Sequence, residues 1–420
     1  MASIESSCKY SHRLFYGWYV VLGGFLVQML NGGLLFHAFS AYVLPLQREF
    51  GWSRAAISGA FSMARAESGI LGPFQGWLID RFGARPIMVF GNLLFGLGFV
   101  LFSRMDSLVT FYLAFVCIAF GSSLGGFMPI IAAITNWFSR RRATAMALTM
   151  VGLGAGGLLV PVVVWGFSTY GWRLTAMGSG VLIWAIGLPA SLLMRHSPER
   201  YGYLPDGGSA STPAESREAL PWTREEPRFT ARQALRTATF WLLSLGHGAA
   251  LLVVGAVLVH QVPHMVTSIG LSEEAAAANV ALLVIVSIVA QMTGGYLGDR
   301  LNKRLIMFGC MWMHAAALVV FAFATTRWEA VLFAVLHGAG WGMRGLLVNA
   351  IRADYFGRTA YASITGFNSL IVMVGMTTGP LFAGFLYDLV GDYQVAFLVL
   401  AFLAAVGSMA FFLAREPVRP

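Results

Sequence analysis

The sequence predicts an all-α membrane protein in which twelve transmembrane helices form two pseudo-symmetric six-helix bundles. Of its 420 residues, 57% are hydrophobic and only 11% are charged, and the mean hydropathy is +0.70. One packed core cannot bury so much apolar surface, so the chain is expected to lie in a bilayer. Twelve apolar windows are each long enough, at roughly 20 residues, to cross about 30 Å of hydrocarbon. The second half of the chain also repeats motifs of the first half.

Each predicted span is an apolar window with few charged residues. In order, the spans are 16–45, 54–79, 85–104, 108–138, 143–168, 172–195, 237–266, 273–298, 304–326, 328–354, 360–387 and 391–414. The first window is too long for the core of a signal peptide and lacks a small-residue cleavage site. We therefore expect the first helix to remain in the protein as an anchor.

Lysine and arginine residues set the predicted orientation, because they favour the cytoplasmic side of a membrane. With the N-terminus inside, 21 of the 28 lie in cytoplasmic segments or at the cytoplasmic ends of spans, and five lie in outer loops or at the outer ends of spans. The remaining two, Arg65 and Arg344, lie inside the membrane. The net charge of +9 is then a signal of topology and not of nucleic-acid binding. We expect an integral protein of a bacterial-type inner or plasma membrane, with both termini cytoplasmic.

A polar segment divides the chain into two predicted domains. Residues 196–236 are rich in Pro, Gly, Ser and mixed charge, which predicts a flexible cytoplasmic linker between an N-terminal bundle (1–195) and a C-terminal bundle (237–420). The bundles share a motif, since "GWLIDRFGARP" at 76–86 precedes "GYLGDRLNKRL" at 295–305 by 219 residues. Such repeats, which rock about a site at the membrane midplane, are typical of secondary transporters.

The repeated motif predicts a cytoplasmic gate. Asp80 lies where the second span meets water, so its carboxylate can pair with basic groups or cap the N-terminus of a neighbouring helix. Gly83 permits a tight turn into the third span. The alternative is that the motif only anchors the topology. The predicted gate residues are Gly76, Asp80, Arg81, Gly83, Arg85, Asp299, Arg300 and Arg304.

Over essentially its whole length the chain resembles the major facilitator superfamily, because it combines the twelve spans, the duplicated loop and the central linker. The motifs "FYGWYVVLGGF" at 15–25, "NWFSRRRATAMALTMVGLGAGG" at 136–157 and "ADYFGR" at 353–358 resemble the branch of monocarboxylate porters and oxalate/formate antiporters. The branch commonly carries an arginine on helix eight where this chain has Gln291, so the resemblance does not specify lactate-like or oxalate-like substrates.

Two arginines are candidates for substrate binding. Arg65 and Arg344 fall near the midplane of their spans, where a lone guanidinium costs at least about 2.5–3.5 kcal/mol and is usually functional. The planar guanidinium can hold an oxyanion in two places. Arg344, together with Arg65, is therefore predicted to bind the anionic head of the substrate. The alternative is a permanent ion pair between Glu67 and one of these arginines.

Smaller polar groups complete the predicted site. Gln291, Asn31, His247 and Asn368 can hydrogen-bond a substrate, although the alternative role is contact between helices. Glu67 is predicted to take up a proton when the substrate displaces it from Arg344. His37, the nearest titratable group on the first helix, is the second candidate for proton coupling. For His37, as for the other histidines in the spans, the alternative is that the ring only packs against neighbouring helices through hydrogen bonds.

No phosphate-binding loop, zinc spacing or nucleophile elbow occurs in the sequence, so we predict neither an enzyme nor a cofactor. We expect a monomeric secondary active transporter that moves a small organic anion, a monocarboxylate, by alternating access and is coupled to protons or works by exchange. One alternative is a proton-driven exporter of hydrophobic drugs. Another is a transporter-shaped sensor, for which the linker and tails are short.

Overall fold

The computed structural model describes residues 15–52, 54–207 and 227–418. Within these ranges the chain is helical and contains no β-strand. The linker predicted at 196–236 falls partly on residues 208–226, which lie outside the described ranges. Its described parts form two short turns and one short helix: η4 (Glu199–Tyr201), η5 (Pro205–Gly207) and α12 (Ala231–Leu235).

Twelve helical runs correspond to the twelve predicted spans. In the N-terminal half they are built from α1 (Gly17–Leu30), the π-helix η1 (Asn31–His37), α2 (Phe39–Phe50), α3 (Arg54–Ile70), α4 (Gly72–Phe82), α5 (Ala84–Ser103), α6 (Leu108–Gly125), α7 (Phe127–Trp137), α8 (Arg142–Ala155), the 3-10 turn η2 (Gly156–Leu159), α9 (Val160–Leu182), the π-helix η3 (Ile183–Gly187) and α10 (Leu188–Leu193). In the C-terminal half they are α13 (Ala238–Thr267), α14 (Glu273–Gly298), α15 (Lys303–Ala322), α16 (Arg327–Phe356), α17 (Tyr361–Val390) and α18 (Gln394–Leu413).

Ten stretches of the described chain are long and apolar enough to cross a membrane. The longest, Arg142–Leu193, contains two runs, because Gly171 inside α9 has φ 77° and ψ 161°, which an α-helix cannot adopt. The predicted second span is not among the ten. It consists of two shorter helices, α3 and α4, which meet at Leu71. This span and the additional run in Arg142–Leu193 bring the number of helical runs to twelve.

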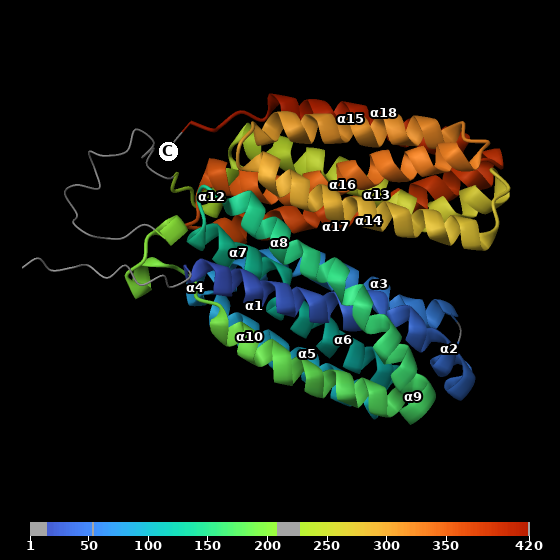
Figure 1. Cartoon of the computed structure of the whole chain (residues 1–420), viewed down its shortest axis with the longest axis horizontal. Coiled ribbons are helices and arrows are strands. Elements are labelled where there is room, and N and C mark those ends of the chain that lie inside the picture. Colours follow the sequence, from blue (N-terminus) through green and yellow to red (C-terminus); the bar gives the residue numbers. More distant parts are fainter. Residues whose placement is uncertain (1–14, 53, 208–226, 419–420) are drawn as a thin grey trace, which may run out of the picture.

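Figure 1 shows the halves side by side, with α1–α10 in one layer and α13–α18 in the other. They meet at the end that carries the linker, α12 and the described end of the chain, and they diverge toward the opposite end, where α2 and the turn of α9 lie. We call these the linker end and the far end. The ribbons of the two halves therefore lie closest together at the linker end.

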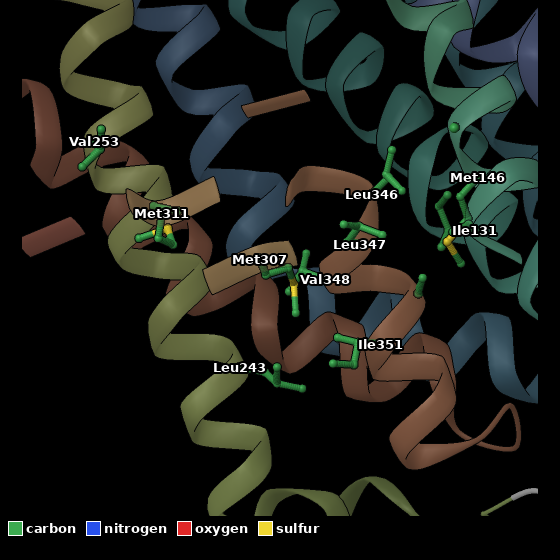
Figure 2. Packing of buried hydrophobic residues seen from close by; sticks show 14 of the residues in the cluster. Ile131, Met146, Leu243, Val253, Met307, Met311, Leu346, Leu347, Val348 and Ile351 are labelled. Carbon is green, nitrogen blue, oxygen red and sulfur yellow. The ribbon is translucent and has the colours of Figure 1, made fainter. Parts of the chain in front are cut away.

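Apolar packing joins the halves near the linker end. The largest buried hydrophobic cluster contains side chains from both of them. In Figure 2, Leu346 and Leu347 of α16 point toward Met146 and Ile131 of the N-terminal half, whereas Met307 and Met311 of α15 pack inside the C-terminal half. The second cluster involves the N-terminal half alone. Among the described residues, the two halves therefore share a hydrophobic core only near the linker end.

An ion pair at the far end ties the first helical run to the sixth. Glu49 of α2 accepts hydrogen bonds from Trp172 Nε1 at 2.6 Å and from Arg173 Nη2 at 2.8 Å. These bonds lower the pKa of Glu49. Because all three residues belong to the N-terminal half, the contact stiffens that half without closing the far end.

Candidate functional site: a central cavity and its closed end

A cavity of about 460 Å³ lies between the two halves. The N-terminal wall comes from the first, second, fourth and fifth helical runs, and the C-terminal wall from α13, α16 and α17. The polar lining residues are Gln28, Asn31, Ser68, Gln75, Ser122 and Ser123 on the N-terminal wall and His247, Asn349, Thr365, Asn368 and Ser369 on the C-terminal wall. The volume is in the range of small-molecule sites, which is roughly 300–1,000 Å³.

The side chains of the N-terminal wall are largely bonded to one another. Gln75 Nε2 donates to Ser123 Oγ at 2.8 Å and to Glu67 Oε1 at 3.3 Å. Ser68 Oγ donates to the other oxygen of Glu67 at 3.2 Å. Ser122 donates to the side-chain oxygen of Asn31. Glu67 therefore lies one hydrogen bond behind the cavity wall.

The C-terminal wall presents polar atoms that have no partner. Asn368 Oδ1 and His247 Nδ1 are buried from solvent and make no hydrogen bond within the described structure. Buried polar atoms are almost always paired, so such atoms point to a missing partner. This wall can bind a polar guest without first breaking internal bonds at these two positions.

Arg344 lies behind the C-terminal wall and does not line the cavity in this conformation. Its side chain is 0% exposed, and none of its three guanidinium nitrogens has a hydrogen-bond partner in the part of the chain described. The next residue, Gly345, lines the cavity, and an added Cβ there would meet no atom within 4 Å. The backbone of α16 at Gly345 thus faces the cavity, and the side chain of Arg344 lies on the far side of this helix surface.

A second buried guanidinium, that of Arg352, lies behind the same wall. Arg352 is 1% exposed, and its Nη1 donates to Oδ1 of the lining residue Asn349 at 3.2 Å. Our sequence reasoning counted Arg352 among the topology residues and missed this contact. The spacing could have revealed it, because Gly345, Asn349 and Arg352 follow the i, i+4, i+7 pattern of one helix face.

Arg344 is surrounded by other buried polar side chains of the C-terminal half. His314 Nδ1 and His337 Nδ1 are 3.1 Å apart, so one neutral ring donates to the other. His247, His314, His337 and Cys310 all lie close enough to Arg344 to interact with it electrostatically. No carboxylate pairs with Arg344 or Arg352 among the residues described, so this wall carries uncompensated positive charge.

The remaining predicted site residues are dispersed. Asn31, His247 and Asn368 line the cavity together. Gln291 is half-buried on α14 outside the cavity lining, and its Oε1 is unpaired. His37 is exposed at the end of η1, next to the lining residue Phe36. The side chain of Arg65 lies outside the described structure, and Glu67 makes no ion pair with Arg344.

The duplicated motif closes the linker end by capping helices across the halves. Asp80 accepts hydrogen bonds from the backbone N–H groups of Ala362 at 3.1 Å and Ser363 at 2.8 Å, in the first turn of α17. Asp299 accepts from those of Ala143 at 2.8 Å and Thr144 at 3.0 Å, in the first turn of α8. A carboxylate there satisfies unpaired N–H groups and complements the helix dipole.

The two caps are related by the internal repeat. The helices that they cap begin at Arg142 and Tyr361, which are 361 − 142 = 219 residues apart, the same offset as the motif. Gly76 and Gly295 lie at these crossings, where an added Cβ would press on the backbone oxygens of Ala362 and Ala143. Glycine at both positions therefore lets the helices approach closely enough for the caps to form.

Three of the four arginines of the motif lie beside aromatic rings. The guanidinium carbon of Arg81 lies 5.3 Å from the ring centroid of Trp77, and that of Arg300 lies 3.8 Å from Tyr296. Arg304 is 6.0 Å from the ring of Phe412, and Arg85 is exposed at the start of α5. Gly83 has φ 87°, as its predicted turn requires. Within the motif, the aspartates and glycines thus contact the opposite half.

Sequence comparison identifies the family. The family model described as Major Facilitator Superfamily matches residues 24–260 and 243–420. The chain belongs to the major facilitator superfamily, and it is a transporter and an integral membrane protein rather than an enzyme.

Relatives and solved structures resemble the chain over nearly its whole length. It is 28% identical to mouse monocarboxylate transporter 11, across 94% of this chain and 87% of the relative, and 25% identical to rat monocarboxylate transporter 13, across 94% and 87%. The fold is similar to that of the transporter FucP in its outward conformation (TM-score 0.74, 15% identity, 96% and 100% coverage) and to that of the human organic anion transporter MFSD10 (TM-score 0.66, 14% identity, 94% and 98% coverage).

Proposed function

We propose that the protein is a secondary active transporter of a small organic anion, a monocarboxylate, and that it works as a monomer by alternating access. The observation that carries this proposal is the uncompensated charge of Arg344 and Arg352 behind one wall of a cavity between the halves. The names of the monocarboxylate transporter relatives support the same class of substrate.

The charge argument rests on the cost of burial. A lone guanidinium costs at least about 2.5–3.5 kcal/mol at the centre of a bilayer, where Arg344 is predicted to lie, and the cost falls when an anion approaches. A carboxylate in the cavity would interact with both arginines through a low-dielectric wall, where Coulomb attraction is stronger than in water. Gly345 lines the cavity without a side chain, and an added Cβ there would meet no atom within 4 Å. We propose that Arg344 reaches the guest beside Gly345 after a change of rotamer.

The polar groups of the C-terminal wall would orient the carboxylate. The amide of Asn368 and the ring of His247 can each donate a hydrogen bond, and both lie on the cavity surface. Asn31 of the opposite wall is proposed to contact the same guest. Arg65 and Gln291 remain proposed contributors in other conformations of the carrier.

Transport is proposed to be coupled to protons or to work by exchange. Glu67 is the proposed proton carrier, because its carboxylate reaches the cavity wall through Gln75 and Ser68. A proton on Glu67 would travel with the anion and reduce the charge that moves across the membrane. His37 is the second candidate for this role.

The caps at Asp80 and Asp299 are proposed to be the cytoplasmic gate. With the linker end facing the cytoplasm and the far end facing outward, the conformation described is closed on the inside. Inward opening then requires both carboxylates to leave the first turns of α17 and α8. Water can replace the lost hydrogen bonds, so the transition is reversible.

The alternative is export of hydrophobic compounds driven by protons. The apolar part of the lining favours it, since Phe36, Phe127, Met128 and Leu251 face the same cavity. Such a guest would leave the guanidiniums uncompensated, and for this reason we place it second.

Transport by purified protein in proteoliposomes tests the proposal. Labelled pyruvate, lactate, benzoate and oxalate are offered with and without an inward proton gradient, and a lipophilic cationic dye is offered in parallel. We expect at least one carboxylate to be taken up above protein-free vesicles and the dye to be ignored. Dye transport without carboxylate transport would establish the alternative, and transport of neither would reject both.

A further inference from the structure

A second cavity, of about 540 Å³, lies at the linker end and shares no lining residue with the central cavity. Its wall comes from the end of α7, both ends of the linker and the turn between α16 and α17. The lining residues that matter for its chemistry are Asn136, His196, Glu199, Arg228, Arg358 and Thr359. We call it the linker cavity.

Hydrogen bonds across the linker cavity join the two halves. Arg358 Nη1 of the C-terminal half donates to the backbone oxygen of Asn136 in the N-terminal half at 3.0 Å and to Glu199 Oε1 of the linker at 2.7 Å. Asn136 Nδ2 donates to the backbone oxygen of His196 at 2.8 Å. The cavity wall is therefore intact only while the halves are closed at this end.

The histidine in this wall offers a hydrogen-bond donor. The backbone N–H of Ala84 donates to His196 Nδ1 at 3.2 Å, so the neutral ring carries its proton on Nε2. Burial lowers the pKa of His196, and the nearby charge of Arg200 lowers it further. At neutral pH the ring is thus uncharged and can donate from Nε2 without losing its bond to Ala84.

The charge of the linker cavity favours an anion. Its charged lining residues are Arg228, Arg358 and Glu199, and Glu199 is already paired with Arg358. Arg228 is exposed, and no contact in the described structure neutralises it. The hydroxyl of Thr359 adds a further donor. The N–H donors of guanidinium groups, together with the hydroxyl and imidazole donors, match the several acceptor oxygens of a phosphate group.

We propose that the linker cavity binds a small phosphate-bearing anion and that the bound anion inhibits transport by holding the two halves closed. A ligand that binds one of two conformations more tightly shifts the population toward it. The volume of about 540 Å³ is adequate for such a ligand. This inference does not depend on which substrate the protein carries.

The first test measures binding to the full-length purified protein in detergent. Calorimetric titration uses inorganic phosphate and glycerol 3-phosphate as probes. The variant Arg228→Gln removes the exposed guanidinium from the cavity, whereas Arg232→Gln removes a matched exposed arginine on α12 that does not line it. We expect binding by the wild type, at least a tenfold loss of affinity in R228Q and less than a twofold change in R232Q.

The phosphate group could belong to a soluble ester or to an anionic lipid, and a second arm separates the two sources. The melting temperature is compared in bilayers of phosphatidylcholine with and without phosphatidic acid. A rise with phosphatidic acid that R228Q abolishes, without binding of the soluble probes, assigns the site to a lipid headgroup and supports the proposal. Binding of neither source, or binding that R228Q leaves unchanged, overturns it.

The inhibitory effect has a separate readout. Glycerol 3-phosphate, or phosphatidic acid if the lipid arm is positive, is supplied to proteoliposomes that transport a carboxylate. We expect it to reduce uptake several-fold in the wild type and in R232Q but not in R228Q. Binding without inhibition would overturn the regulatory part. Failure of all carboxylate transport would reject the proposed function and leave the binding result intact.

Discussion

The two walls of the central cavity differ in how far their polar groups are satisfied. On the N-terminal wall, Gln75, Ser123, Ser68 and Glu67 form one hydrogen-bonded network. On the C-terminal wall, Asn368 carries an unpaired side-chain atom, and the guanidinium behind it has no partner in the described structure. One wall is complete without a guest and the other is not.

This difference separates two tasks that a carrier must perform. A fully hydrogen-bonded network can hold a proton without leaving buried polar groups unpaired. A wall with unpaired polar groups is instead stabilised when a guest binds and pairs with them. This difference supports the proposal that the C-terminal half recognises the anion and the N-terminal half handles the proton. Four tests, which use six substitutions and run from the largest expected effect to the smallest, can break or sharpen this division and the way the two halves are joined.

Arg344→Met tests the C-terminal wall most directly. We expect carboxylate uptake to fall at least about 100-fold, which corresponds to roughly 2.8 kcal/mol. We also expect the thermal stability to rise, because replacing a buried charge by an apolar side chain of similar size often stabilises by about 1–4 kcal/mol. Uptake assays and thermal unfolding of the same preparation check both effects, with Arg232→Met as the control. Normal uptake by R344M would remove Arg344 from the site.

Glu67→Gln tests the N-terminal wall. The amide keeps the shape of the side chain but cannot carry the coupling proton. We expect accumulation driven by a proton gradient to fall about tenfold or more, because a step of proton transfer is lost. Exchange of labelled for unlabelled carboxylate should change less than about twofold, since the anion contacts lie on the other wall. Equal loss of both activities would contradict the division of tasks.

Asn368→Ala and Gln75→Ala compare one side chain from each wall. Asn368 lines the cavity, and its amide N–H is proposed to donate to the carboxylate, so its loss should weaken carboxylate transport by about tenfold, the value of one good hydrogen bond. Its Oδ1 has no hydrogen-bond partner in the described structure, so stability should change little. Gln75 bonds to Ser123 and Glu67, so its loss should lower stability by about 1–3 kcal/mol. Substrate-concentration series and thermal unfolding separate the two effects. The reverse pattern would show that the walls have exchanged roles.

Asp299→Ala and Asp80→Ala compare how the two halves are held together at the linker end. Asp299 also accepts from Thr144 Oγ1 at 2.6 Å, and beside it Asp354 pairs with Arg142 at 2.6 Å and with Lys303 at 2.8 Å. At the other cap the position that matches Asp354 is Asn136. We expect each substitution to cost about 1–3 kcal/mol and D299A to cost more than D80A, as measured by thermal unfolding. Equal costs would mean that the neighbouring ion pairs contribute nothing.

The elements of the fold and the caps could be predicted from the sequence because they depend on local patterns. Apolar windows predicted the helical runs, and the repeat of Asp80 at Asp299 predicted one gate contact at a helix end in each half. The caps themselves were one of two options, because an aspartate at a helix end can bond to a side chain or to a helix N-terminus. The position of its partner helix decides between them.

The site was less predictable, because it depends on which face of each helix meets the other half. Asn31, His247 and Asn368 were chosen as polar residues in apolar spans, and they do line the cavity. Arg344 was expected to point into it and lies behind its wall, where Gly345 occupies the surface. Successive residues of an α-helix point about 100° apart around its axis. A shift of one residue therefore decides whether Arg344 or Gly345 faces the cavity.

The sequence by itself determined that this chain spans a membrane, that it consists of two related halves and that its few buried charges are costly, because hydropathy, repetition and charge burial are properties of residues and their order. Only the tertiary structure decided which polar groups are satisfied. Pairing depends on distances of about 3 Å between helices that lie far apart in the chain. That is why the contrast between a complete and an incomplete cavity wall became visible only in three dimensions.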